Sequence, residues 1–242
     1  VQPHVSLISV NSENSYYTSH TLNMRNCYLL FGGGNSEDCM FGRFVVNSKD
    51  ILDGLSLYSC ERCYEGIASE KCYNCLYFQN CRNCSDSLMI EDCQNCRHCL
   101  LCFGLQNSEY CILNEKLGKD LYEQRMKELV PLTRETITAL RSRFIELKAK
   151  LPHRWAHIFN SENCTGDMIF NSKNCHHAFD CTDCEDSKFL CYTPKTNNSY
   201  DCTYNAPDGA QWAYEVGSTV GVHNAMSTFL CWYGSNLLYC RE

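Results

Sequence analysis

Hydrophobic and polar residues recur along this chain with a period of twelve, from Asn11 to about Gly118. Each row of twelve usually begins with Asn followed by Ser or Cys, and its fifth position is usually Cys. The sixth position is apolar or aromatic in all nine rows: Tyr16, Tyr28, Met40, Leu52, Tyr64, Leu76, Leu88, Leu100 and Ile112. A unit this short cannot fold alone, so the rows must stack on one another.

The recurring motif is Asn-(Ser/Cys)-x-(Asn/Asp)-Cys-apolar. Asn, Asp and Ser favour turns, because their short side chains bond nearby backbone groups and tolerate left-handed φ. The residues that follow, such as 41–46, 55–58 and 88–90, are typical of β-strands. A turn and a short strand every twelve residues predict an all-β fold, a parallel β-solenoid (β-helix) of 12-residue units. Stacking of the Asn column predicts a ladder of side-chain amides.

The length of one coil is a separate question. A coil of twelve residues has a narrow bore that admits little beyond Ser, Thr, Ala and Cys, whereas each row here carries several of Phe, Leu, Tyr, Met and Ile. We therefore expect two repeats per coil, about 22–24 residues.

The repeat is interrupted once. Residues 115–155 lack the motif and predict a helical insert, with helices at about 119–129 and 134–151. Thr133 is the expected N-cap of the second helix, and Pro152 marks its exit. Residues 1–114, opening with a lead-in strand at 1–10, form the first solenoid block, and 156–242 form a second with an irregular, aromatic-rich C-terminal cap.

The second predicted helix carries an apolar stripe at spacings of three and four residues: Ile137, Leu140, Phe144, Leu147 and Leu151. Such a stripe marks one face of a helix. Two uses are open for it. It packs on the solenoid, or it is a contact between protein chains in an oligomer.

The 242 residues carry a formal net charge of −7, with a pI near 5.6. This balance argues against nucleic acid as a partner, which needs clustered Lys and Arg. No apolar run approaches the roughly 18 residues of a membrane span. We therefore expect protein partners, in a homo- or hetero-oligomer.

The chain has 21 Cys, many of them in seven CxxC pairs that include Cys181 and Cys184. Close thiolates can bind zinc or an iron–sulfur cluster. The densest stretch offers the candidate ligands Cys72, Cys75, Cys81, Cys84, Cys93, Cys96, Cys99 and Cys102. The internal alignment favours packing without a cofactor, because Ser, Met or Ile replaces Cys in both Cys columns and a ligand position cannot accept Ile. Disulfides between or within rows are a third possibility. The structural ladder on the packing interpretation comprises Cys27, Cys39, Cys60, Cys63, Cys111, Cys164 and Cys175.

No catalytic residues can be assigned. The acidic pairs Glu37/Asp38, Glu91/Asp92 and Glu185/Asp186 occupy the turn of the repeat, where solvated corner residues are expected. Solenoid enzymes that act on polysaccharides do place acids on one strand face, so this class is kept as a less favoured alternative.

The phrase CFGLQNSEYCILN at 102–114, together with units such as NSENC and NSKNC, resembles a family of Cys- and Asn-rich repeat proteins predicted from uncultivated bacteria and bacteriophages. The resemblance covers about 11–190, and Leu105 stands where the family phrase often has a further Cys. The family has no established activity. It implies a structural or interaction protein, a component of a phage particle or a protein of the bacterial surface.

Overall fold

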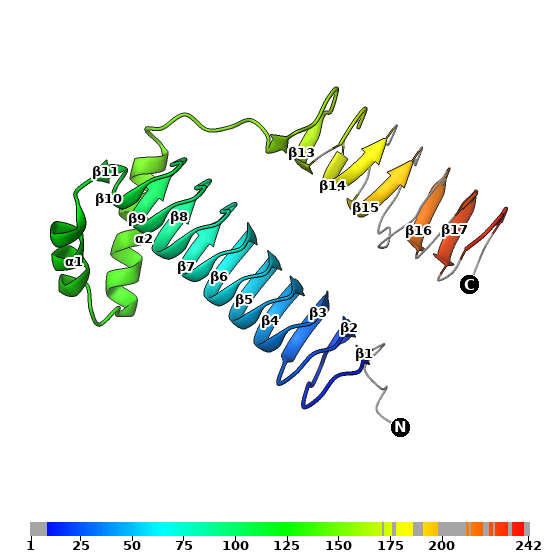
Figure 1. Cartoon of the computed structure of the whole chain (residues 1–242), viewed down its shortest axis with the longest axis horizontal. Helices are drawn as coiled ribbons and strands as arrows, with labels where there is room; N and C mark the ends of the chain where they lie inside the picture. Colours follow the sequence, from blue (N-terminus) through cyan, green and yellow to red (C-terminus); the bar gives the residue numbers. More distant parts are fainter. Residues whose placement is uncertain are drawn as a thin grey trace. The chain divides into compact units, whose positions relative to one another are not determined.

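The computed structural model describes residues 9–170, 172–175, 178–185, 191–197, 212, 214–219, 223–224, 226–231 and 234–239. The chain divides into two compact units, Val1–Pro152 and His153–Glu242, called here the first and second units. Each unit contains a stack of parallel strands, and the helices belong to the first (Figure 1).

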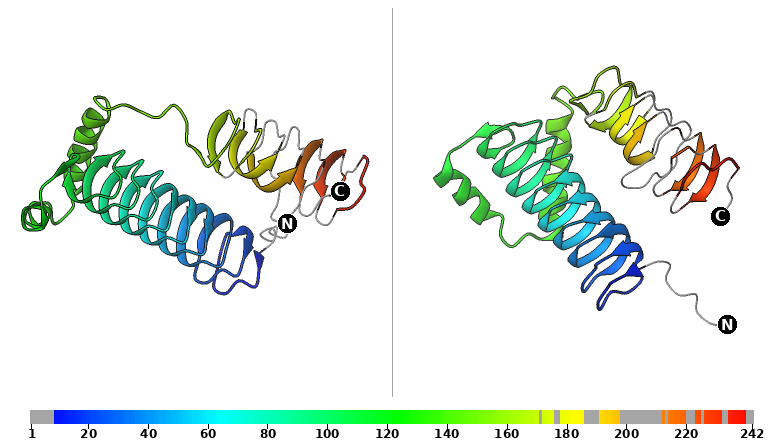
Figure 2. Two further views of the ribbon diagram at one scale, coloured as in Figure 1. Left: turned by 45° about the horizontal axis from the view of Figure 1, so that its top comes forward. Right: turned by 45° about the vertical axis from the view of Figure 1, so that its right-hand side comes forward.

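The first unit is a β-solenoid whose strands follow one another in chain order in a single sheet of eleven. The strands are β1 (Ser9–Val10), β2 (Ser19–Leu22), β3 (Tyr28–Gly34), β4 (Glu37–Val46), β5 (Lys49–Tyr58), β6 (Glu61–Glu70), β7 (Tyr73–Gln79), β8 (Ser85–Glu91), β9 (Arg97–Phe103), β10 (Glu109–Ile112) and β11 (Glu115–Lys116). The parallel solenoid predicted from the repeat is confirmed, and Figure 2 shows its turns as a stack of loops.

One turn of the solenoid, called here a rung, contains twelve residues. Lys49 pairs with Glu61 and Tyr73 pairs with Ser85, an offset of twelve that holds throughout parallel strands β1–β10. The expectation of two repeats per coil is therefore wrong. It assumed that the large apolar residues lie inside, whereas many of them, including Tyr16 and Met40, lie on the outer surface.

The narrow rung depends on a left-handed residue that turns the backbone at every third position. From Asn11 to Leu113, every third residue has a positive φ, with Gly only at Gly32 and Gly104. A residue in this left-handed conformation turns the chain, and four such corners divide each rung into four short sides. Asn and Asp are the non-glycine residues that tolerate this conformation best, which explains their recurrence at corners.

The same period decides which side chains point inward. The residue after each corner faces the lumen, so luminal positions also recur every third residue and form four columns along the stack. Cys60, Cys63, Gly66 and Ser69 are the four luminal residues of one rung, and all four are buried. The CxxC spacing is therefore the spacing of adjacent sides of a four-sided coil.

Large luminal side chains fit because glycine lies beside them, either in the same column or in the same rung. Phe78 is 2% exposed, and a Cβ atom built on Gly66 in the preceding rung would lie 2.4 Å from its Cζ. Gly54 makes room for Ile51 and Leu57, its two luminal neighbours within the same rung. The lumen is thus filled by matching large and small residues rather than by a wide bore.

Amide ladders join the corners of successive rungs, as the Asn column predicts. Asn83 donates from Nδ2 to Oδ1 of Asn95 at 3.0 Å, and Asn95 donates to Asn107 at 2.9 Å. A second ladder runs from Asn14 through Asn26 to Asp38. These bonds help to offset the roughly 1 kcal/mol or more that each left-handed residue costs.

Two helices follow the solenoid strands of the first unit, α1 (Lys119–Glu128) and α2 (Arg134–Lys148). Both lie where the sequence predicts them. The hydroxyl of Thr133 accepts a hydrogen bond from the backbone N–H of Thr136, which confirms the expected N-cap. At the end of the stack, the amide of Asn114 bonds both the N–H and the carbonyl of Phe103, and β11 pairs antiparallel with β10.

The second unit repeats this arrangement in β12 (Ile158–Phe159), β13 (Gly166–Phe170), β14 (Ala178–Glu185), β15 (Cys191–Asn197), β16 (Glu215–Thr219) and β17 (Ser227–Cys231). All its strand pairs are parallel. The offset is eleven between β12 and β13 and twelve in the others, including β16 with β17. Of the lead-in strand expected at 1–10, Ser9–Val10 is present and the rest lies outside the described residues.

We expect Gly66→Ala to lower the free energy of unfolding by about 1–3 kcal/mol, because the new methyl group overlaps Phe78. Phe78→Leu alone leaves a cavity and costs about 1–2 kcal/mol. The double variant should lose at least 0.5 kcal/mol less than the sum of the single losses, roughly the size of coupling between contacting residues. Urea titration followed by circular dichroism measures these values. Strict additivity would contradict this packing of the lumen.

Candidate functional site: a thiol-lined lumen beside an apolar face

The candidate ligands between Cys72 and Cys102 lie on all four sides of the lumen. They occupy the first luminal column (Cys72, Cys84, Cys96), the second (Cys75, Cys99), the third (Cys102) and the fourth (Cys81, Cys93). All eight are at most 1% exposed. The four-sided coil therefore distributes them along the walls of the stack rather than gathering them at one point.

Each of these thiols is hydrogen-bonded to the backbone in one repeating geometry. Cys84 donates from Sγ to the carbonyl of Arg82 at 3.5 Å and to that of Cys93 at 3.4 Å. These acceptors lie two residues before and nine residues after the donor. Cys27, Cys39, Cys60 and Cys63 use the same two positions.

Serine in a luminal position makes the same contacts. Ser36 donates from Oγ to the carbonyl of Gly34 at 3.1 Å and to that of Val45 at 3.2 Å, again two before and nine after. Ser48 accepts a hydrogen bond from the N–H of Cys60, its neighbour in the next rung. This shared geometry explains why Ser and Cys alternate in one column, and it supports packing as the role of the thiols.

The luminal environment shifts thiol pKa values in both directions: hydrogen bonds from neighbouring thiols lower the pKa of Cys84 and Cys102, whereas the pKa values of Cys81 and Cys111 are raised. Burial raises the pKa of Cys81 well above its usual value, and contacts with the thiols of Cys84 and Cys93 raise it further. Burial likewise raises the pKa of Cys111. Among the residues that the structure describes, no three His, Cys, Asp or Glu side chains are arranged to hold a metal ion.

The ladder cysteines of the second unit follow the same rule. Cys164 donates to the carbonyl of Glu162 and to that of Ser172, the latter only eight residues on because this rung has eleven residues. Cys175 is buried and donates to Lys173. The 15 cysteines whose side chains are described, Cys111 among them, are free thiols. The side chains of Cys181 and Cys184 lie outside the described residues.

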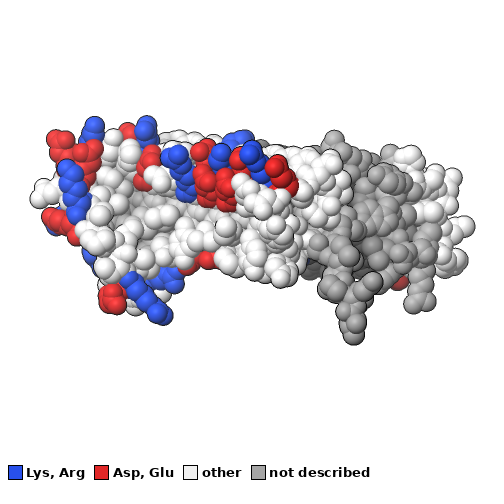
Figure 3. Space-filling model, turned by 90° about the horizontal axis from the view of Figure 1, so that it is seen from below, with Lys and Arg blue, Asp and Glu red and all other residues white. Residues whose placement is uncertain are grey.

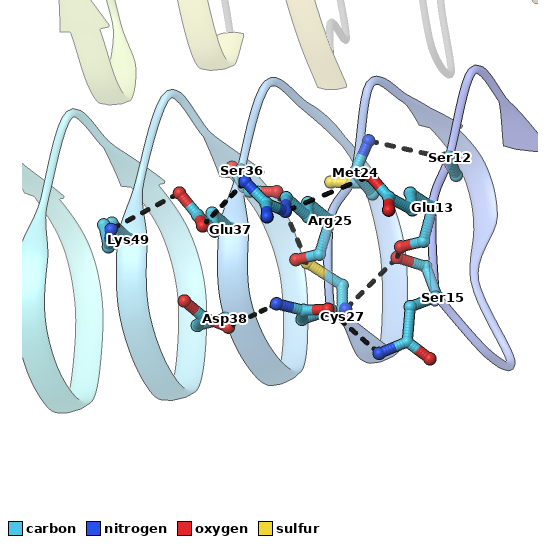
Figure 4. A network of polar contacts seen from close by, with 12 residues as sticks. Ser12, Glu13, Ser15, Met24, Arg25, Cys27, Ser36, Glu37, Asp38 and Lys49 are labelled. Carbon is cyan, nitrogen blue, oxygen red and sulfur yellow. Dashed lines mark hydrogen bonds and ion pairs between the residues drawn. The ribbon is translucent and has the colours of Figure 1, made fainter.

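Of the acidic pairs, Glu37/Asp38 is engaged in ladders on the outer surface, and the side chains of Glu185/Asp186 lie outside the described residues. Glu37 forms ion pairs with Arg25 at 3.5 Å and with Lys49 at 3.4 Å, each one rung away (Figure 4). Its neighbour Asp38 accepts the amide of Asn26. Glu91 pairs with Lys148 of α2 at 2.5 Å. These contacts fit a structural role for the acids.

The sixth column of the repeat forms a continuous outer side of the first unit, called here the apolar face. It consists of that column, from Tyr16 to Ile112, and the adjoining corner residues Tyr17, Leu29, Phe41, Asp53, Glu65, Tyr77, Met89, Leu101 and Leu113. Figure 3 shows one side of the molecule, on which charged residues gather in rows and uncharged residues form the broad surface between them.

The two helices cover one end of the apolar face. Leu140 of α2 and Tyr122 of α1 are both 4% exposed, in one cluster with Leu88 and Leu101. Ile137 and Phe144 pack against the same cluster. Leu147 and Leu151 are half-buried. The helical stripe thus lies largely on its own solenoid.

The other end of the face is open. Tyr16 is 61% exposed, Met40 43% and Leu52 38%. The sequence displays this column plainly, but the expectation of a wide coil assumes that the large apolar residues of each row lie inside. The CxxC spacing indicates that every third residue faces the lumen. The sixth column directly follows one of these luminal positions, so this period identifies it as external.

Comparisons of this chain with protein-family models, with curated proteins and with solved structures found no match. Within the described residues, neither helix has the length and apolar character needed to cross a membrane. Functional inference therefore depends on the geometry of the lumen and of the apolar face.

We expect the purified, reduced protein to contain 21 titratable thiols after denaturation and less than one equivalent of zinc or iron. The Cys96→Ser variant should lose no more than about 1 kcal/mol of stability, because serine reproduces the luminal hydrogen bonds. Thiol titration, elemental analysis and thermal melting measure these quantities. Stoichiometric metal, or collapse of the fold in Cys96→Ser, would contradict the packing role.

Proposed function

We propose that this protein is a non-catalytic scaffold that presents the open end of its apolar face to a protein partner, in a homo- or hetero-oligomer. The observation that carries the proposal is the contiguous exposure of Tyr16, Tyr17, Tyr28, Met40, Phe41 and Leu52 on consecutive rungs. Large contiguous apolar surfaces on soluble proteins mark interaction sites.

The construction of the first unit suits such a role. The strands of successive rungs pair along the backbone, and amide ladders and thiol contacts add bonds between many of the rungs, so the outer positions are held at fixed spacing. Rigid elements lose little conformational entropy when a partner binds. The acids that a catalytic alternative would use, such as Glu37, are occupied in ion pairs.

The setting that we propose, from the resemblance of the repeat units, is a bacteriophage particle or a bacterial surface. The free luminal thiols are compatible with assembly in a reducing cytoplasm. Cofractionation with phage particles or with the cell envelope distinguishes the two settings.

A photo-crosslinking amino acid in place of Leu52 tests the scaffold role in cells that produce the protein. Leu22 is the matched control, because it is a leucine of similar exposure, 45% against 38%, on a different side of the rung. We expect a discrete adduct of defined mass at position 52 and none at position 22. Equal labelling at both positions, or no adduct at 52, would refute the proposed use of the face.

A further inference from the structure

The covered and open ends of the apolar face are built from the same two columns of the repeat. Leu76, Leu88 and Leu100 under the helices occupy the positions of Met40 and Leu52 in the open end. The helices therefore show what this surface accepts. Both ends present large apolar side chains, more of them aromatic at the open end, so the open end continues an interface that the chain already forms.

The helical cover combines an apolar stripe with flanking basic groups. Ile137, Leu140 and Phe144 supply the stripe. Arg141 bonds Glu65 at 2.6 Å and lies 4.8 Å from the ring centre of Tyr77. Lys148, about two helical turns after Arg141, bonds Glu91. An amphipathic helix with Arg or Lys beside its stripe is thus complementary to this face.

Like the covered end, the open end has an apolar surface with acidic residues beside it, but neither α1 nor α2 lies on it. Its apolar part includes an edge-to-face aromatic series, with ring centres of Tyr17 and Tyr28 at 5.5 Å and those of Tyr28 and Phe41 at 5.8 Å. Asp50 and Asp53 flank Leu52 on its two sides, and both are exposed.

The charges around the open end favour a basic occupant over a second copy of the chain. The nearest cations are already engaged, Lys49 with Glu37 and Arg62 with Glu61 and Tyr73. A second copy packed face to face would bring the exposed acids of one rung against those of another. Like charges held close together oppose such packing.

We propose that the open end of the apolar face binds a basic amphipathic helix of a partner protein, in the manner of α2. This proposal rests on the proposed scaffold function and specifies its partner. The rungs from Tyr16 to Leu52 are spaced about 4.8 Å apart and a helix rises about 1.5 Å per residue, so a helix of roughly ten to thirteen residues spans them. The apolar stripe of the partner helix would contact the sixth column, and its Lys or Arg side chains would reach Asp50 and Asp53.

A peptide with the sequence of residues 134–151 is the probe, because it carries the stripe, five Lys or Arg and two Glu, a formal side-chain charge of +3. We expect saturable binding of the labelled peptide to the full chain by fluorescence anisotropy. Leu52→Asp should weaken binding about tenfold or more, the effect of losing roughly 1.4 kcal/mol. Leu22→Asp should leave affinity within about twofold.

The acidic flank is tested separately. The Asp50→Asn/Asp53→Asn variant should weaken binding of the basic peptide severalfold, but not that of a peptide with Gln in place of Arg141, Arg143 and Lys148. An equal effect on both peptides would overturn the charge assignment. A monomer–dimer equilibrium in sedimentation that Leu52→Asp abolishes would instead identify a second copy as the occupant and overturn the helix proposal.

The outcomes separate this proposal from the scaffold function. If the peptide does not bind while the crosslinker at position 52 still gives a discrete adduct, the helical occupant is wrong and the scaffold function stands. If neither signal is seen, both are wrong.

Discussion

The backbone of the first unit turns left-handed at every third residue, and the rest of the structure depends on this constraint. It shortens each side of the coil to three residues and closes a rung in twelve. It also assigns each triplet position one place, at a corner, in the lumen or on an outer side. The conformation is unfavourable for most residues. It persists because corner amides are bonded in ladders and every rung pairs along its backbone with its neighbours.

The abundance of cysteine follows from the size of the lumen. Most luminal residues are small, and Ser and Cys also donate hydrogen bonds to nearby carbonyl groups through one repeated geometry. Where Phe78 or Leu57 enters, glycine lies beside it. A CxxC spacing that is typical of metal centres in other proteins is here the distance between adjacent walls. The apolar face is the external counterpart, because its large side chains recur at positions that the triplet period places on the outside.

Much of the architecture could be predicted from the sequence. The twelve-residue columns predict the solenoid, the Asn column predicts its ladder, and Thr133 and Pro152 predict the limits of α2 closely. The coil length could not be obtained from the apolar content alone, because that content does not say which column faces inward. The Gly42–Gly54–Gly66 column, which accommodates large neighbours, has meaning only once the rungs are stacked. The open and covered ends of the apolar face likewise carry mostly large apolar residues at the same two positions of the repeat, so the sequence does not tell which end is covered. Only the packed positions of Leu140 and Phe144 distinguish them.

The triplet period is the central claim, and thiol accessibility measures it directly. Cysteine is placed at position 73 or 74, between the native Cys72 and Cys75, and the folded protein is alkylated with iodoacetamide and analysed by mass spectrometry. Tyr73 and Asn74 are exposed, whereas Cys72 and Cys75 are buried. Rapid modification at both 73 and 74, with 72 and 75 protected, is the predicted result. Protection of 72 and 74 with modification of 73 and 75 would indicate an ordinary strand of period two and would contradict the four-sided coil.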